Sequence, residues 1–389
     1  MKRIQHTTYS IGVLLCLTMA LLLSACSSDS TSDVSPVDKT QDRVLSLSAG
    51  VQEFLQDHES SSAPGITRAI TYPDATWSAY SPGVSEKLLL FIAKQKEDPA
   101  SSDILSRLLM FSSNSNDWQT NITIVDAKSS YSIYGFLPVN NETVSLSLVS
   151  PSTNYKNGGQ LTIAGLTPLT DTDPCVIVGV SDNQAAKNSA VTLQWGKFDF
   201  KFKEGEGDVT DYMSILLDHL FSQYSFKIKM DEDYAKLRKI RITKMTVEPI
   251  DDQGNALSSI DVTIPLVANS NNSNPLGTLT YSRHTGGTSA VKTLYESNSN
   301  PLELTSSVQD LASFQAAADQ RLFRITTSYQ VLNRQGQLIR TEENVSNKIN
   351  LSITSTTPGT KHTVTITVNP TYLYMLSDPD LDNPTITIN

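Results

Sequence analysis

The chain has 389 residues, of which 40 are acidic and 30 are basic, so its formal net charge at pH 7 is −10. This acidic balance argues against nucleic acid as a partner, because phosphate contacts need a basic surface. It also argues against electrostatic attraction to an anionic membrane.

The first 26 residues have the pattern of a bacterial lipoprotein signal. Lys2 and Arg3 precede an uncharged apolar run over residues 11–23, which is too short to span a bilayer. The run ends in LSAC (23–26), which matches the lipobox that precedes a lipidated cysteine. We therefore expect residues 1–25 to be a signal peptide and Cys26 to become an acylated N-terminus, which forms a durable membrane anchor.

Residues 26–43 are mostly Ser, Thr, Asp and Pro, which predicts a disordered tether between lipid and fold. The next stretch, VLSLSAGV (44–51), alternates Leu45, Leu47, Ala49 and Val51 with small residues and predicts a first strand. The length favours two domains. Glycine and charge in KEGEGD (203–208) place their boundary near residue 204, giving an N-terminal domain over 44–204 and a C-terminal domain over 205–389.

Arg68 is the first base after residue 43, and it lies inside GITRAITYP (65–73), which otherwise has the composition of a strand. The polar segment ESSSAPG before it would make the bond between Arg68 and Ala69 accessible to a protease that recognises a guanidinium. The alternative is an edge-strand charge that prevents aggregation.

Most of the remaining chain alternates with period two, which predicts strands with one solvated face. In KIRITKMTV (239–247) the apolar residues change from even to odd positions between Ile242 and Met245, which predicts a bulge. Pro265 inside its apolar run predicts an edge strand. Apolar spacings of three or four predict short helices over 209–221 and 308–318. The predicted fold is therefore all-β: antiparallel sandwiches with Greek-key connections and one or two short helices.

Residues that could carry catalysis are sparse, so no enzyme activity and no cofactor are expected. The histidines lack metal-ligand spacing, and none of the common nucleophile or nucleotide motifs occurs. Cys175 lies in the apolar run CVIVGV and is expected to be a buried core residue. The acidic stretch DPDLDN (378–383) lacks the glycine and the final glutamate of a calcium loop, so we expect a solvated turn there and no metal site.

The order of these features resembles the fimbrillin-like proteins of Bacteroidia, the precursors of type V pili. The resemblance rests on the lipobox, the polar tether, VLSLSAGV, TRA before a Trp-containing segment, YSIYGFLP (131–138), CVIVGV, LDHLFSQYSFKI (217–228) and the C-terminal TVNPTYLYMLSDPDLDNPTITIN. It implies two transthyretin-like β-sandwich domains, export as an outer-membrane lipoprotein at the cell surface, cleavage by an arginine-specific protease, and assembly with other pilus subunits by strand exchange.

Cleavage between Arg68 and Ala69 would release residues 44–68 and open a groove that had held Leu45, Leu47 and Val51. The candidate donor strand is 372–389, where apolar residues alternate on either side of DPDLDNP: Tyr372, Tyr374, Leu376, Ile386 and Ile388. The same segment could instead be an ordinary final strand. A second functional hypothesis is a monomeric surface lipoprotein that binds glycan or another ligand through exposed aromatic side chains.

Overall fold

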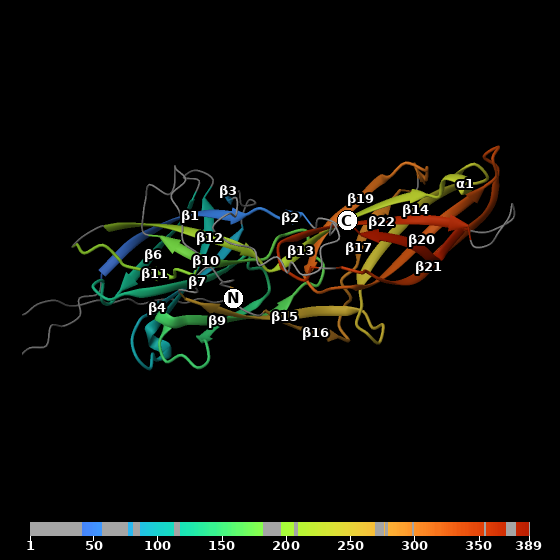
Figure 1. Cartoon of the computed structure of the whole chain (residues 1–389). Coiled ribbons are helices and arrows are strands. Elements are labelled where there is room, and N and C mark those ends of the chain that lie inside the picture. Colours follow the sequence, from blue (N-terminus) through green and yellow to red (C-terminus); the bar gives the residue numbers. More distant parts are fainter. Residues whose placement is uncertain are drawn as a thin grey trace, which may run out of the picture. The chain divides into compact units, whose positions relative to one another are not determined.

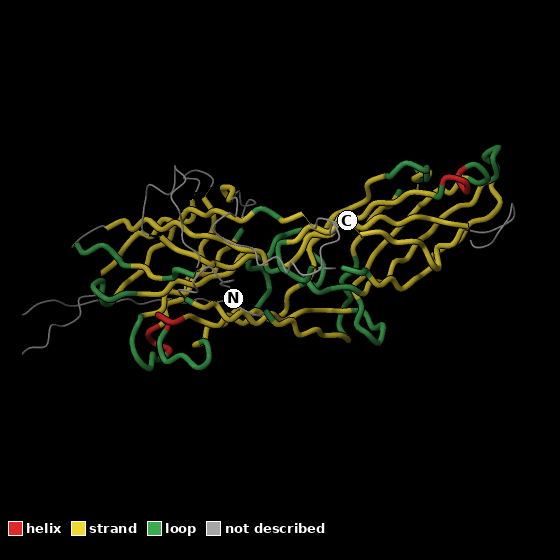
Figure 2. Tube along the Cα trace, in the orientation of Figure 1, coloured by secondary structure: helices red, strands yellow, loops and turns green. Residues whose placement is uncertain are grey.

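The computed structural model describes residues 41–56, 77–80, 86–112, 117–181, 196–205, 209–268, 276, 279–297, 299–353, 355–370 and 379–388. Strands dominate these residues, as Figure 2 shows, and the helical segments are single turns. They are the α-helix α1 (Glu232–Ala235) and the 3-10 helices η2 (Ser101–Asp103) and η3 (Tyr155–Asn157). The all-β prediction is confirmed.

Sheet A contains nine strands: β1 (Gln41–Gln52), β3 (Trp77–Ala79), β4 (Lys87–Lys94), β5 (Ile104–Ser112), β6 (Asp117–Ile124), β7 (Tyr131–Leu137), β10 (Cys175–Ser181), β11 (Asp199–Phe200) and β12 (Val209–His219). Seven of them form a ring in the order β10-β12-β1-β6-β5-β4-β7, because β7 also pairs with β10. A closed ring has no free edge in its pairing order. This closed sheet does not confirm the tandem transthyretin-like sandwiches that the sequence resemblance implies.

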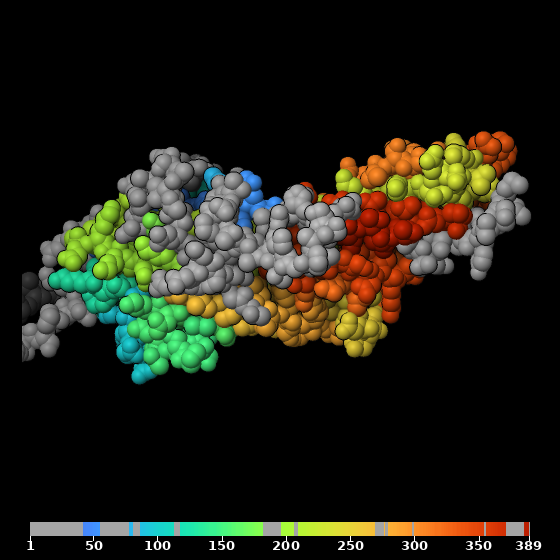
Figure 3. All heavy atoms as spheres, in the orientation of Figure 1, coloured from blue at the N-terminus to red at the C-terminus, as the bar shows by residue number. Residues whose placement is uncertain are grey.

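Sheet C consists of β8 (Thr143–Leu148), β9 (Gly158–Leu166), β15 (Leu257–Val267) and β16 (Thr280–Thr285). It packs on one face of sheet A through a shared apolar core, which includes Tyr134 and Phe136 of β7 and Ile260, Val262 and Ile264 of β15. In Figure 3 the surface of β9 (green) continues into that of β15 and β16 (gold), in line with the β9–β15 pairing. Residues far apart in the sequence therefore build one layer.

Sheets B and D pack on each other around a third apolar core. Sheet B contains β2 (Leu55–Gln56), β13 (Phe221–Met230), β19 (Gln309–Ala317), β22 (Thr360–Pro370) and β23 (Pro379–Ile388). Sheet D contains β14 (Lys239–Pro249), β17 (Lys292–Glu296), β18 (Leu302–Glu303), β20 (Leu322–Leu332) and β21 (Leu338–Asn350). Figure 1 labels β2, β13, β19 and β22 of sheet B and β14, β17, β20 and β21 of sheet D.

The two predicted helices are strands, which is a correction with a clear physical cause. Residues 209–221 form β12 and the start of β13, and residues 308–318 contain β19. Met213, Ile215 and Leu217 of β12 face the core inside sheet A, whereas Leu216 faces the core shared with sheet C. A strand buried on both faces loses the period-two alternation, so its apolar spacing imitates a helix.

Four further predictions concern local structure and pairing. The bulge in β14 is confirmed by a register shift between Ile242 and Lys244. β15 is not an edge strand, because it lies between β9 and β16, although its pairing with β16 ends at Thr263, before Pro265. The all-antiparallel expectation is wrong, since β1 pairs with β12, and β13 with β22, in parallel. The turn expected in DPDLDN is replaced by the start of β23.

The proposed boundary near residue 204 falls between β11 and β12, which are both strands of sheet A. A division there would cut through one sheet. β12 ends at His219 and β13 begins at Phe221, so Leu220 alone separates the strand of sheet A from the strand of sheet B.

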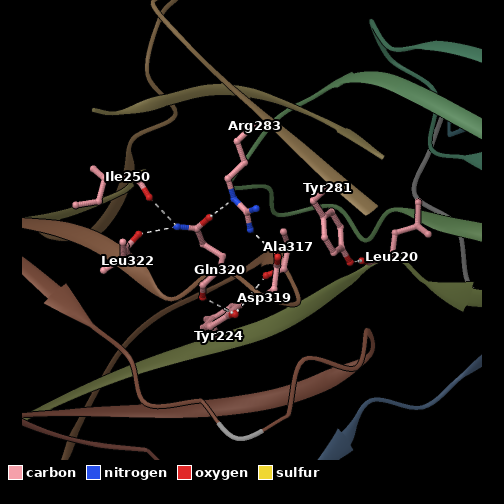
Figure 4. Close-up of polar contacts among 9 residues, drawn as sticks. All are labelled: Leu220, Tyr224, Ile250, Tyr281, Arg283, Ala317, Asp319, Gln320 and Leu322. Carbon is pink, nitrogen blue, oxygen red and sulfur yellow. Dashed lines mark hydrogen bonds and ion pairs between the residues drawn. The ribbon is translucent and has the colours of Figure 1, made fainter. Parts of the chain in front are cut away.

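A polar network around the buried side chain of Gln320 lies beside this passage, as Figure 4 shows. The side chain of Gln320 donates to the carbonyls of Ile250 (3.2 Å) and Leu322 (2.6 Å) and accepts from Nε of Arg283 (3.2 Å). Arg283 also pairs with Asp319. Because Arg283 lies on β16 and Leu322 begins β20, the network ties sheet C to sheet D.

We expect Gln320→Ala to lower the free energy of unfolding by about 1–3 kcal/mol, because the carbonyls of Ile250 and Leu322 lose the amide donor of a side chain that is 2% exposed. The carbonyl of Leu322 still accepts from the backbone N–H of Ile250. The matched control is Gln335→Ala, an exposed glutamine in the β20–β21 turn, which should change stability by no more than about 0.5 kcal/mol. Urea unfolding of both variants measures the difference, and equal effects would contradict this role for Gln320.

Candidate functional site: the slot of the first strand

β1 lies between two neighbours along its length. It pairs in parallel with β12 from Arg43↔Val209 to Val51↔Leu217, and antiparallel with β6 from Gln41↔Ile124 to Leu47↔Trp118. Beyond the end of β6, β3 pairs with its last residues. We call the space between β6 and β12 that β1 fills the β1 slot.

The apolar residues predicted for this strand point into sheet A. Leu45 and Leu47 are fully buried, whereas Ala49 and Val51 are half-buried against the same core. Burial of a leucine side chain contributes about 1.5–3 kcal/mol, so the two leucines supply most of the apolar hold on the strand. Val51 contributes less than a fully buried residue would.

A buried ion pair holds the start of β1. Nη1 of Arg43 lies 2.6 Å from Oδ2 of Asp211, and both side chains are at most 2% exposed. Nη2 of Arg43 donates to the carbonyl of Lys203, and the guanidinium lies 5.7 Å from the centre of the Phe202 ring. The backbone N–H of Lys203 also donates to Asp211 Oδ1, at 2.9 Å.

The sequence prediction missed Arg43, because it assigned residues 26–43 to the tether. β1 begins at Gln41 and includes this arginine. The spacing of residues could have identified it. Arg43, Leu45 and Leu47 are two residues apart, and side chains at this spacing in a strand point to the same face, here the inner face of sheet A.

A second buried carboxylate lies on the opposite face of the strand. Ser46 donates its hydroxyl hydrogen to Oδ2 of Asp117 at 2.5 Å, and both residues are buried. Ser48 and Ser214 lie within hydrogen-bond distance, with their hydroxyl oxygens 3.2 Å apart. The small polar residues that alternate with the leucines therefore bind specific partners on β6 and β12.

His219 holds the end of β1. Its Nε2 lies 2.6 Å from the carbonyl oxygen of Gln52, and because a carbonyl can only accept, Nε2 is the donor. Its Nδ1 lies 2.7 Å from Oδ2 of Asp173, and its ring stacks on Phe54 with centroids 3.9 Å apart. Burial alone would lower the pKa of His219, but the hydrogen bond and charge of Asp173 outweigh it and raise that pKa.

Cys175 lies beside the same ring, with Sγ 3.9 Å from Nδ1 of His219. The expectation of a buried core thiol is confirmed, since the residue is fully buried. Burial, followed by the charge of Asp173, raises the pKa of this thiol well above its usual value. A nucleophilic cysteine needs a lowered thiol pKa. In a catalytic triad the nucleophile and the carboxylate contact different nitrogens of the histidine, whereas here Cys175 and Asp173 both face Nδ1 of His219.

The segment after β1 reaches sheet B. β2 pairs in parallel with Thr360 and Lys361 of β22, and β23 pairs with the same strand from Val364 to Pro370. Since β13 occupies the other edge of β22, β2 and β23 follow one another along one edge. Ile386 and Ile388 of β23 are half-buried against the core between sheets B and D.

Several predicted site residues lie outside the described residues: Cys26, Arg68, Ala69, Tyr372, Tyr374 and Leu376. Their roles stay predictions. Among the described residues, no helix is long and apolar enough to cross a membrane.

We expect Arg43→Met to lower the free energy of unfolding by about 3–5 kcal/mol, because it leaves Asp211 buried without its cation. Adding Asp211→Asn should recover part of the loss, since the amide oxygen can still accept from Lys203. The matched control is Lys244→Met, which breaks an exposed pair with Glu296 and should cost at most about 1 kcal/mol. Chemical unfolding that gave equal losses for Arg43→Met and Lys244→Met would contradict the argument.

No family model and no curated protein sequence matches the chain. Its fold is similar to that of a fimbrial protein from Bacteroides vulgatus, with a TM-score of 0.41 and 12% identity over 79% of this chain and 92% of that one. It is also similar to the fimbrial anchor protein Mfa2 from Porphyromonas gingivalis, with a TM-score of 0.32 and 9% identity over 88% of this chain and 97% of the other. A protein assigned to cell adhesion from Bacteroides eggerthii matches with a TM-score of 0.39 and 10% identity, over 90% and 95% of the two chains.

Proposed function

We propose that this chain is a structural or adhesive subunit of a surface pilus that is assembled by protease-triggered strand exchange. The observation that carries the proposal is the position of β1. The strand precedes Arg68 in the chain, whereas both of its neighbours in sheet A follow Arg68. A cut after Arg68 would therefore break the only covalent link between β1 and the strands that bind it.

The proposed route begins at the membrane. Residues 1–25 direct export, Cys26 receives the lipid, and the chain is held at the outer membrane until an arginine-specific protease cuts between Arg68 and Ala69. The lipid, the tether and β1 would leave together. The two-domain, transthyretin-like organisation belongs to the same proposal.

Loss of β1 would expose an apolar slot with two unpaired edges. β6 and β12 would each lose a ladder of backbone hydrogen bonds, and the core would lose Leu45 and Leu47. Such a slot favours refilling by a strand from another subunit. Assembly of this kind needs neither nucleotide nor cofactor.

The candidate donor, residues 372–389, contributes β23 to sheet B in the free chain. Donation would require β23 to leave β22. Its side chains Ile386 and Ile388 are half-buried, so less apolar contact would be lost there than in the β1 slot.

The charges of the slot favour a donor from a different subunit. Asp211 binds the guanidinium of Arg43, and a replacement strand without a cation would leave that carboxylate buried and unpaired. Residues 372–389 contain no Lys or Arg. A donor strand that has Lys or Arg two residues before its first inward-facing apolar residue, as Arg43 precedes Leu45, could form the ion pair with Asp211. Residues 372–389 of a second copy of this chain could not.

The glycan-binding alternative has no observation in its favour among the described side chains. The large hydrophobic residues that are exposed there are aliphatic: Leu108, Met110, Val125, Val267, Val291, Val308, Leu338 and Ile339. Trp118, for example, is buried in the core of sheet A. A flat sugar platform needs exposed aromatic rings.

We expect Arg68→Ala to give a lipid-anchored monomer that keeps its first strand, because the protease loses the side chain that it recognises. Arg334→Ala, at an exposed arginine in the β20–β21 turn, is the matched control and should be processed and assembled normally. N-terminal sequencing of shed protein and laddering on unboiled gels give the readout. Polymers of the Arg68→Ala protein would refute cleavage at this bond as the trigger.

Deletion of residues 372–389 tests the donor separately. If this segment is the donor, the truncated chain should be cleaved but should not extend polymers, and it should cap those of the wild type. If it is an ordinary final strand, sheet B loses β23 and the C-terminal half should unfold, with indiscriminate proteolysis. Electron microscopy and limited proteolysis separate the two outcomes, and a folded, truncated chain that polymerised normally would rule out this donor.

We expect the slot to discriminate donors by charge. In the cleaved protein, a peptide of residues 41–54 should displace the labelled original strand, and the same peptide with Arg43→Ala should bind at least about tenfold more weakly, because it leaves Asp211 unpaired. A peptide of residues 372–389 should also compete poorly. Fluorescence anisotropy measures the displacement, and equal competition by the two 41–54 peptides would contradict charge selection.

A further inference from the structure

We propose that Asp173, Cys175 and His219 form a binding site for a divalent transition metal ion of the zinc class. Their ligand atoms, a carboxylate oxygen, Sγ and Nδ1, lie within 4.8 Å of one another. Oxygen, sulfur and imidazole nitrogen are the donors that Zn²⁺ uses in proteins. The proposal does not depend on pilus assembly.

The backbone fixes two of the three ligands. Cys175 begins β10 and His219 ends β12, and the two residues are direct partners in the antiparallel pairing of these strands. Asp173 precedes Cys175 by two residues, and its side chain is 21% exposed, which gives an ion a path from solvent. The sequence did not reveal this set of ligands. Asp173 and Cys175 are two residues apart, but His219 follows Cys175 by 44 residues, so no local motif contains all three.

The separations suit a tetrahedral ion after a small adjustment. Nδ1 lies 3.9 Å from Sγ and 2.7 Å from Oδ2 of Asp173. Ligands at Zn²⁺ bond lengths of about 2.0–2.3 Å are roughly 3.3–3.8 Å apart at tetrahedral angles, so the carboxylate would retreat by about 0.5–1 Å. Water or the second oxygen of Asp173 could take the fourth position.

Two features of the site itself point to a cation. Oδ1 of Asp173 is buried and has no hydrogen-bond partner among the described residues. Asp218, which is also buried, accepts from the backbone N–H of His219. A bound dication would supply a partner for Oδ1 of Asp173 and would offset the negative charge of the carboxylate that faces Nδ1 of His219.

The outer nitrogen of His219 is already oriented as a metal ligand requires. Metal-binding histidines usually donate their other ring N–H to a carboxylate or a backbone carbonyl, which fixes the tautomer. Here Nε2 donates to the carbonyl of Gln52 at 2.6 Å, while Nδ1 faces Cys175 and Asp173. An ion would replace the proton on Nδ1 and the proton on the Cys175 thiol, both of which pass to solvent, and it would fix the ring that holds the end of β1.

The test is metal binding by the full chain after dialysis against a chelator. We expect one Zn²⁺ per chain, a thiolate-to-metal absorption band on addition of Co²⁺, and a rise in Tm when Zn²⁺ is restored. Cys175→Ser should abolish the absorption band while Cys16 and Cys26 stay in place. Asp173→Asn, which keeps the shape of the side chain, should weaken binding by at least about tenfold.

The matched control is His284→Gln. His284 forms a similar pair with Asp261, at 2.9 Å, but both side chains are more exposed and no cysteine is in that pair. Its loss should leave stoichiometry, absorption and the Tm rise unchanged. The proposal is overturned if the wild type binds no stoichiometric ion, if the band survives Cys175→Ser, or if His284→Gln reduces binding as much as Asp173→Asn.

Discussion

The pairing of β1 with both β6 and β12 is the constraint on which sheet A depends. In the order of the ring, β1 is the strand that joins β6 to β12, so the sheet closes only while β1 is present. The same β12 runs through Leu220 into β13, the parallel partner of β22. The strand β1 therefore stabilises a ladder that extends through sheet A toward sheet B, although a single segment of the chain connects it to its partners β6 and β12.

The two ends of β1 are held by different chemistry. At its start, Arg43 and Asp211 form a buried ion pair, which fixes register more than it adds stability, because desolvation offsets much of the attraction. At its end, the backbone of Gln52 is held by His219, so this contact depends on no side chain of the strand. A replacement strand would thus be selected by sequence at one end and accepted through backbone shape at the other.

Many strands were predictable because apolar residues that face a core alternate with polar residues on the other face, as Leu45 and Leu47 alternate with serines in β1. Prediction failed where burial was on both faces, as in β12, since no polar position then marks the solvent side. It failed also for contacts between distant segments. Arg43 meets Asp211 across 168 positions, and His219 meets Gln52 across 167, so neither partner could be identified from local pattern.

On the proposed function, these contacts bear on how the strand would leave. Cutting the chain after Arg68 removes a covalent link but breaks none of the contacts of Leu45, Leu47 or Arg43. Full dissociation would expose both leucines and an unpaired Asp211 at once, which makes it slow. An incoming strand that pairs first near the Gln52 end would replace backbone hydrogen bonds one by one and would expose little of the slot at any moment. Because the Gln52 end requires no particular side chain, any incoming strand can begin to pair there. A strand that lacks a cation for Asp211 would be rejected only when pairing reaches the opposite end of the slot.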